Sequence, residues 1–234
     1  MRRVAIFVEG QSELIFVREF LLKWFDYQID LECRNLFTDE KIDRAYYDFS
    51  NPSADIHFQV INVGMDGNVL SRILSREQYL YNAGYERIIG LRDMYSGDYK
   101  KVIKDRMVDL QVNEKFKQGT FLSIYQKAKR PDQIRFCFAI MELEAWWIGI
   151  PSLWGNIDSE LRQQNETRFS FPELIFHPAV FIDQLFQSKN NTYKKKKAEV
   201  ESIVGKISRD DFVNLHDSQR CPSFCEFVQH VQPQ

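Results

Sequence analysis

The stretch RRVAIFVEGQSE, residues 2–13, decides the fold because it joins a buried strand to a helix through a turn that carries two acids. Its apolar run stops at Glu9, Gly10 follows, and Glu13 comes four residues after Glu9. Glycine permits a sharp turn without a steric penalty, and residues 12–25 have the apolar spacing of a helix packed on a sheet. If that helix begins at the turn, both carboxylates approach the same point near its first turn.

The same order of elements recurs along the chain. Residues 55–63 alternate as a second strand, and residues 69–84 have helical spacing with a glycine stop. Short apolar strands are then expected over 86–93 and 133–142, and they end at Asp93 and Glu142. The intervening stretch, from about 26 to 54, is polar and poorly periodic, and its pattern assigns no element to it. Because parallel strands need crossovers of this length, the order predicts an α/β fold with a mostly parallel sheet flanked by helices.

Composition sets the bounds on function. The chain has 234 residues, and 44% of them are hydrophobic, which excludes general disorder. No stretch approaches the roughly 18 uncharged apolar residues of a membrane span, so we expect a cytoplasmic protein that does not enter the membrane. A net charge of −2 gives no overall attraction to nucleic acid. We expect an α/β core over 1–154 and a mainly helical extension over 155–234 packed on it, or a single domain.

Acids end three of the expected strands. In open parallel sheets, binding sites form beyond the carboxyl ends of the strands, so Glu9, Asp93 and Glu142 are expected to converge. Glu144 shares a face with Glu142 if that segment is extended and not if it is helical. Oxygen ligands without imidazole or thiolate favour Mg²⁺ or Mn²⁺, ions suited to phosphodiester chemistry. The alternative is that each acid, and Glu13 above all, caps a helix N-terminus and stabilises its dipole.

A run of four lysines is the clearest basic feature, comprising Lys194, Lys195, Lys196 and Lys197. Such a patch can hold a nucleic-acid backbone through phosphate contacts that do not depend on base sequence. A solvated surface is the equally weighted alternative, since lysine runs are common on ordinary surfaces. The sequence leaves both interpretations open.

The motifs resemble a known family. FVEGQSE, residues 7–13, resembles the first motif of Toprim domains, the fold shared by topoisomerases, primases and nucleases of the overcoming-lysogenisation-defect type. IIGLRDMYSGD, residues 88–98, resembles the second motif. The order of these motifs, followed by AIMELEAWW at 139–147, is similar to an uncharacterised bacterial family of small Toprim-like proteins whose third motif reads His-Glu-Phe-Glu-Ala. Weaker similarity continues in TYKKKKAEV and CPSFCEFV, at 192–200 and 221–228.

The resemblance implies a Toprim-type nuclease that uses Mg²⁺ or Mn²⁺. It also implies a role as the effector of a bacterial phage-defence system beside an ATPase partner. Glu9 would then act as a metal ligand or as the general acid/base, and Lys194, chosen for its Tyr-x-Lys neighbourhood, would stabilise charge in the transition state. The implied metal ligands are Glu9, Glu13, Asp93 and one or both of Glu142 and Glu144.

Two departures from the family pattern favour an alternative. Tyr95 stands where the second motif has a further aspartate, so that Asp98 is the nearest substitute, and Met141 stands where the third motif has histidine. The alternative is a noncatalytic Toprim-like module that binds nucleic acid or a partner protein through a degenerate metal site. The sequence does not distinguish DNA from RNA, and it leaves a homo-oligomer open.

Overall fold

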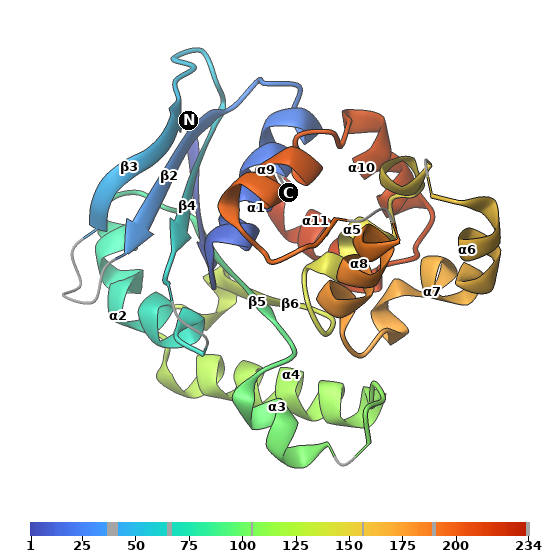
Figure 1. The fold of residues 1–234 in the computed structure, drawn as a ribbon. Helices are drawn as coiled ribbons and strands as arrows, with labels where there is room; N and C mark the ends of the chain where they lie inside the picture. The colour runs from blue at the N-terminus through green and yellow to red at the C-terminus, as the bar shows by residue number, and fades with distance from the viewer. Residues whose placement is uncertain (37–41, 65–66, 104, 156, 189–190, 233–234) are drawn as a thin grey trace.

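A computed structural model describes residues 1–36, 42–64, 67–103, 105–155, 157–188 and 191–232. Within these residues, six strands form one sheet in the order β3-β2-β4-β1-β5-β6 (Figure 1). The strands are β1 (Arg2–Val8), β2 (Asp30–Leu36), β3 (Ile42–Phe49), β4 (Ile56–Asn62), β5 (Arg87–Asp93) and β6 (Ile134–Ala139). All neighbouring pairs are parallel except β2 and β3. The predicted α/β class with a mostly parallel sheet is confirmed.

Two strands, β2 and β3, lie within residues 26–54, the polar stretch to which the sequence pattern assigns no element. Leu31 and Cys33 of β2 are buried, while Asp30, Glu32 and Arg34, which alternate with them, are polar and partly exposed. Glu32 accepts a hydrogen bond from Gln59 of β4 at 2.8 Å and pairs with Arg34 of its own strand. Cross-strand partners therefore satisfy polar residues that have a weak strand pattern in the sequence.

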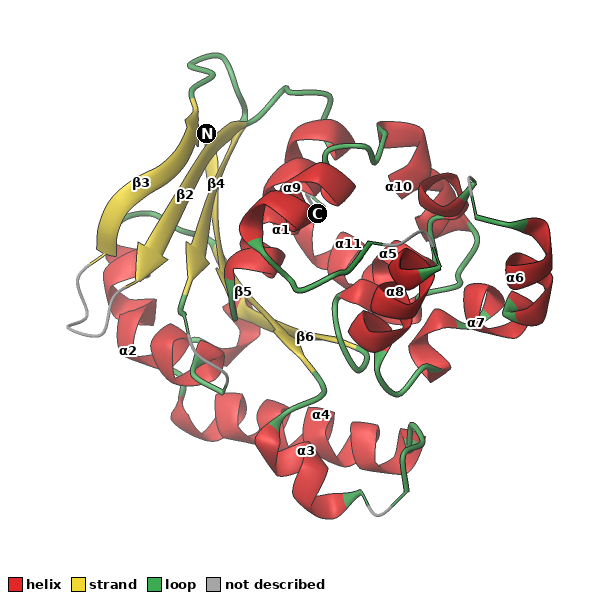
Figure 2. Ribbon diagram, in the orientation of Figure 1, coloured by secondary structure: helices red, strands yellow, loops and turns green. Residues whose placement is uncertain are grey.

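Helices cover both faces of the sheet (Figure 2). The alternation of β1 explains this, because Val4, Ile6 and Val8 join one hydrophobic cluster and Ala5 and Phe7 join another. The helices are α1 (Gln11–Trp24), α2 (Val69–Asn82), α3 (Gly97–Val102), α4 (Leu110–Lys127), α5 (Glu144–Ile148), α6 (Ser159–Gln164), α7 (Glu166–Ser170), α8 (Pro178–Gln187), α9 (Lys197–Val204), α10 (Arg209–Asp217) and α11 (Pro222–Val231). No helix among the described residues is long and apolar enough to cross a membrane.

The helical C-terminal region shares its core with the sheet. Phe16 and Phe20 of α1 lie edge-on to Phe212 of α10, with ring centroids 5.7 and 5.3 Å apart. Trp146 of α5 is fully buried between Phe16 and Phe224 of α11. Because this one cluster contains residues from β1 through α11, the C-terminal helices fix the position of α5 relative to the sheet.

We expect Gly90→Ala, in the middle of β5, to destabilise the fold by about 1–3 kcal/mol through overpacking. A Cβ atom at Gly90 would lie 2.6 Å from the Phe136 ring and 2.9 Å from Ile73 Cδ1. The matched control is Gly119→Ala in α4, where a Cβ meets nothing within 4 Å. That change should stabilise the helix by about 0.5–1 kcal/mol. Urea unfolding of the two variants should give shifts of opposite sign, and a neutral Gly90→Ala would contradict the tight packing of β5 against β6.

Candidate functional site

Glu9 and Asp93 meet at the carboxyl edge of the sheet. Glu9 follows the last residue of β1, and Asp93 is the last residue of the neighbouring strand β5. Glu9 Oε2 accepts a hydrogen bond from the backbone N–H of Asp93 at 3.1 Å. The parallel register, which pairs Val8 with Leu91, brings both acids to the same edge.

Glu13 lies in the first turn of α1, and its side chain is buried. The pKa of Glu13 is raised to about 7, mainly by burial and also by the negative charge of Glu144, while hydrogen bonds from the backbone N–H groups of Glu13 and Gly10 and the charge of Lys195 oppose the shift. Gly10 is the N-cap of α1, so the carboxylate does interact with the helix N-terminus. It also lies within the field of other acids. The surroundings of Glu13 are therefore compatible with both interpretations, a helix-capping acid and a member of an acidic site.

Asp93 connects β5 to the segment that carries the remaining acids. Its Oδ1 accepts a hydrogen bond from the backbone N–H of Leu143 at 2.9 Å. Burial raises the pKa of Asp93 well above its usual value, and the nearby charges of Glu13 and Glu144 add to the effect. A carboxyl group in these surroundings is strongly disfavoured in its charged form unless a cation is close.

Glu142 and Glu144 flank Leu143 just after β6. Glu144 is the first residue of α5, and Glu142 lies in the loop before it. Both carboxylates nevertheless contact Lys195. Lys195 Nζ lies 3.1 Å from Glu144 Oε1 and 3.7 Å from Glu142 Oε1. Glu142 Oε2 also accepts from the backbone N–H of Ala179 at 2.9 Å, in the first turn of α8. Glu142 therefore caps a helix as well as facing the lysine.

Lys195 is the residue that sequence reasoning missed. Lys194, which the family pattern suggested, lies 3.6 Å from Asp183 through its Nζ, and 57% of its side chain is exposed. Lys195 instead approaches Glu144, whose side chain is 1% exposed. Although burial disfavours its charge, Glu144, Asp93 and Glu142 raise the pKa of Lys195 above its usual value. Of the four lysines in the run, all of them described, Lys195 is the one in contact with these acids.

The signal for Lys195 was present in the sequence. Counted from Tyr193, the spacing Tyr-x-Lys ends at Lys195, so the motif spacing itself names Lys195. The Tyr193 hydroxyl donates to Glu144 Oε1 at 2.8 Å, so tyrosine and lysine hold the same carboxylate. Of the other two lysines, Lys196 is the N-cap of α9, and Lys197 Nζ lies 4.6 Å from the centre of the Tyr46 ring.

Tyr95 and Met141, the two departures from the Toprim-like motifs, pack against other side chains. Tyr95 stacks edge-on against His177, with ring centroids 4.6 Å apart. Asp98 pairs with Lys101 at 2.9 Å, and its side chain is 76% exposed, so it does not replace the missing aspartate at the acidic site. Met141 is fully buried and has a left-handed backbone with φ of 60°. Lys195 shares that conformation with φ of 53°, and strain of this kind concentrates at functional sites.

The acidic site comprises Glu9, Glu13, Asp93, Glu142, Glu144 and Lys195, and its carboxylates suit a hard cation by their chemistry. All five acids offer carboxylate oxygen, which Mg²⁺ and Mn²⁺ prefer. Within the described residues, however, no group of three or more aspartate, glutamate, histidine or cysteine side chains is arranged to hold a metal ion. Glu142 and Glu144 instead contact the Lys195 ammonium. Metal binding would therefore require these carboxylates to reorient.

No family model, curated protein or solved structure matches the chain. The resemblance to Toprim domains therefore depends on the motifs quoted above. What the acidic site can do is inferred from its own residues.

Proposed function

We propose that the chain is a divalent-metal-dependent nucleic-acid phosphodiesterase of the Toprim type. The observation that carries the proposal is the gathering of five carboxylates and one lysine at the carboxyl ends of β1, β5 and β6, which are consecutive strands of a parallel sheet. Ligands of such sheets bind beyond this edge. The raised pKa values of Glu13 and Asp93 support the proposal, because perturbed carboxyl groups are common at functional sites; burial is the main cause of both shifts, and the neighbouring acids add to it.

In this proposal, the acids bind metal and Lys195 stabilises charge on the phosphate. Glu9, Glu13, Asp93 and one or both of Glu142 and Glu144 would hold Mg²⁺ or Mn²⁺, and the bound ion would supply charge neutralisation and an acidified water. Glu9 serves as a ligand or as the group that accepts and returns a proton. Lys195 takes the role first assigned to Lys194, since an ammonium has three donors and can direct one to a phosphate oxygen while Glu144 holds it.

The remaining basic residues of the run supply the substrate contacts in this proposal. Lys194, Lys196 and Lys197 are exposed beside Lys195, where they can bind successive phosphates of DNA or RNA. By the resemblance described above, the chain acts in the cytoplasm as the effector of a bacterial phage-defence system. An ATPase partner, or a second copy of the chain, would then reorient the carboxylates for metal binding.

The absence of a preformed metal group among the described residues favours a second candidate function. In a noncatalytic module, Lys195 serves as a built-in cation that stabilises the acids permanently. Tyr95 in place of an acid is consistent with this arrangement. The two candidates differ in whether added metal changes the protein.

Metal titration of the wild-type chain separates these candidates. Cleavage of single- and double-stranded DNA and RNA is measured for the chain alone and after addition of the ATPase partner, and we expect it with Mg²⁺ or Mn²⁺, and not with EDTA, once the partner is present. At a metal concentration of 100 times Kd, the folded state should gain about 2.7 kcal/mol, which raises the melting temperature. A melting temperature unmoved by millimolar Mg²⁺ and Mn²⁺, together with no cleavage, would assign the noncatalytic function.

A further inference from the structure

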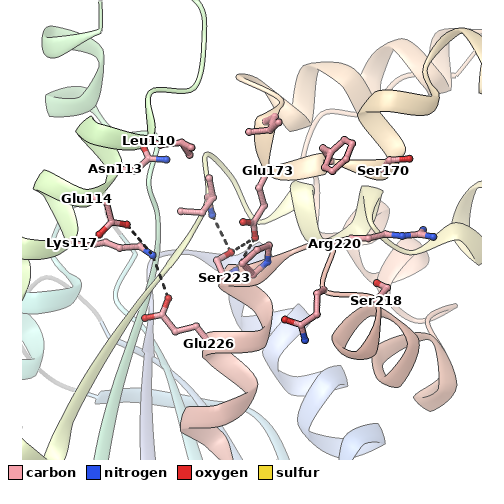
Figure 3. Close-up of a pocket in the computed structure, with 15 residues that line it drawn as sticks. Leu110, Asn113, Glu114, Lys117, Ser170, Glu173, Ser218, Arg220, Ser223 and Glu226 are labelled. Atoms are coloured by element: carbon pink, nitrogen blue, oxygen red, sulfur yellow. Dashed lines mark hydrogen bonds and ion pairs between the residues drawn. The ribbon is translucent and has the colours of Figure 1, made fainter.

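A cavity lies next to the acid-bearing segment 141–144. This cavity, of about 520 Å³, opens between α4, residues 170–174 and the first turn of α11 (Figure 3). This volume is in the range of about 300–1,000 Å³ typical of small-molecule sites. Ile140, which lines it, directly precedes the segment 141–144, while the described lining includes none of the five acids of the acidic site.

The cavity contains a buried carboxamide whose polar atoms lack partners. Asn113 of α4 lines the cavity, and the residue is 3% exposed. Neither its Nδ2 nor its Oδ1 has a hydrogen-bond partner among the described residues. Leaving such a group unsatisfied is costly, and most buried polar groups in proteins are bonded. Figure 3 shows Asn113 on the side of α4 that faces Glu173 and Ser223.

The charges around the cavity favour an uncharged occupant. Lys117 Nζ lies 3.5 Å from Glu226 and 3.9 Å from Glu114, so its charge is balanced. Glu173 Oε1 accepts hydrogen bonds from the Ser223 hydroxyl at 2.5 Å and from the Ser223 backbone N–H at 3.0 Å. This carboxylate oxygen is therefore already bonded to the first turn of α11. Arg220 is the other cation of the lining, so the carboxylates of Glu114, Glu173 and Glu226 outnumber the two cations that an anion in the cavity would meet.

The rim of the cavity is apolar. Phe171, Leu110 and Leu174 line it, and they are 57%, 62% and 57% exposed. A flat ring placed against these side chains would cover apolar surface that now faces water, and aromatic side chains are common platforms for bases. The cavity thus combines an apolar platform with one donor and one acceptor from Asn113.

We infer that this cavity binds an uncharged nucleobase, with the base edge paired to the Asn113 carboxamide and the ring against Phe171 and Leu174. Asparagine presents a donor and an acceptor side by side, the pattern that pairs with the edge of a base. The base can come from a free nucleoside or from an unpaired residue of a bound strand. The inference does not depend on the phosphodiesterase proposal, because the cavity and the acidic site have different residues.

Binding to the full chain tests the inference directly. Adenosine, guanosine, cytidine and uridine are titrated by calorimetry, with ribose 5-phosphate as the probe that lacks a base. We expect at least one nucleoside to bind and Asn113→Leu to weaken its binding at least about tenfold. The matched control is Gln118→Leu, which removes an exposed carboxamide from the same helix outside this cavity and should leave binding unchanged.

A stability measurement separates a binding role from a structural one. Without ligand, Asn113→Leu should raise the melting temperature by about 2–4 °C, because an apolar group of similar size replaces an unpartnered amide. If this variant fails to fold, Phe171→Ala at the exposed rim still tests the inference and should weaken binding severalfold. Nucleoside binding left unchanged by both substitutions would overturn it.

The source of the base is settled with oligonucleotides. If free nucleosides bind, the cavity is a nucleoside site; if they do not, a single-stranded oligonucleotide should bind more tightly than its abasic counterpart of equal length. Loss of this preference in Asn113→Leu or Phe171→Ala supports the strand-bound base. Equal binding of the abasic strand, with no nucleoside binding, overturns the inference, as does binding of ribose 5-phosphate as strong as that of any nucleoside.

Discussion

Glu9→Gln is expected to reduce metal-dependent cleavage by about a hundredfold to a thousandfold, the loss typical when one polar group that stabilises the transition state is removed. Glutamine keeps the size of the side chain, and its Oε1 can still accept the hydrogen bond that Asp93 N–H now donates to Glu9 Oε2. The change removes the negative charge that would attract a metal ion. Nucleic-acid binding should persist or strengthen, because one repulsive charge near the phosphates is lost.

The matched control for Glu9→Gln is Glu86→Gln. Glu86 lies just before β5, and its side chain, which pairs with Arg2 at 3.3 Å, is 55% exposed. Both variants lose one glutamate carboxylate. If Glu86→Gln cleaves as fast as the wild type while Glu9→Gln does not, the loss of cleavage comes from the position of Glu9 and not from the change in net charge. Cleavage is measured with the ATPase partner present, and binding is measured at several salt concentrations. Unchanged cleavage by Glu9→Gln would make Glu9 a structural acid that joins β1 to β5.

Local sequence patterns are enough to predict the strands that carry the acids. The apolar runs before Glu9 and Asp93 are short, fully buried and followed by a turn, so their class and their ends follow from neighbouring residues alone. Placing both acids at one edge then needs only the rule that parallel strands end on the same side. The sequence could therefore predict that these residues lie close together.

The features that the sequence did not predict depend on contacts between distant residues. β2 has a polar face because Glu32 finds its partner in Gln59, 27 residues away. The Tyr-x-Lys spacing names Lys195, but its contact with Glu144, which lies 51 residues earlier, cannot be read from that spacing. The burial of Asn113 depends on the helices that pack around α4, and its exposed neighbours on α4 give no sign of it. Periodicity carries no information about such pairs.

Lys195→Met is expected to lower the free energy of unfolding by about 2–3 kcal/mol, below the 3–5 kcal/mol of a fully buried pair because 38% of the lysine side chain is exposed. The change leaves Glu144 almost fully buried without the ammonium that lies 3.1 Å away. For a chain of this length, the melting temperature should fall by about 4–12 °C. The control is Lys194→Met, whose exposed pair with Asp183 should contribute less than about 1 kcal/mol.

A second substitution shows whether the loss comes from uncompensated charge. If Glu144 is destabilising once Lys195 is gone, the double variant Lys195→Met with Glu144→Gln should be more stable than Lys195→Met alone. Mg²⁺ should also restore more stability to Lys195→Met than it adds to the wild type, because a divalent ion can replace the lost ammonium among the carboxylates. Both measurements are thermal or urea unfolding of folded variants, so neither needs catalytic activity. Equal losses from Lys194→Met and Lys195→Met would instead show that the run is an ordinary solvated surface, and that the acids are stabilised without it.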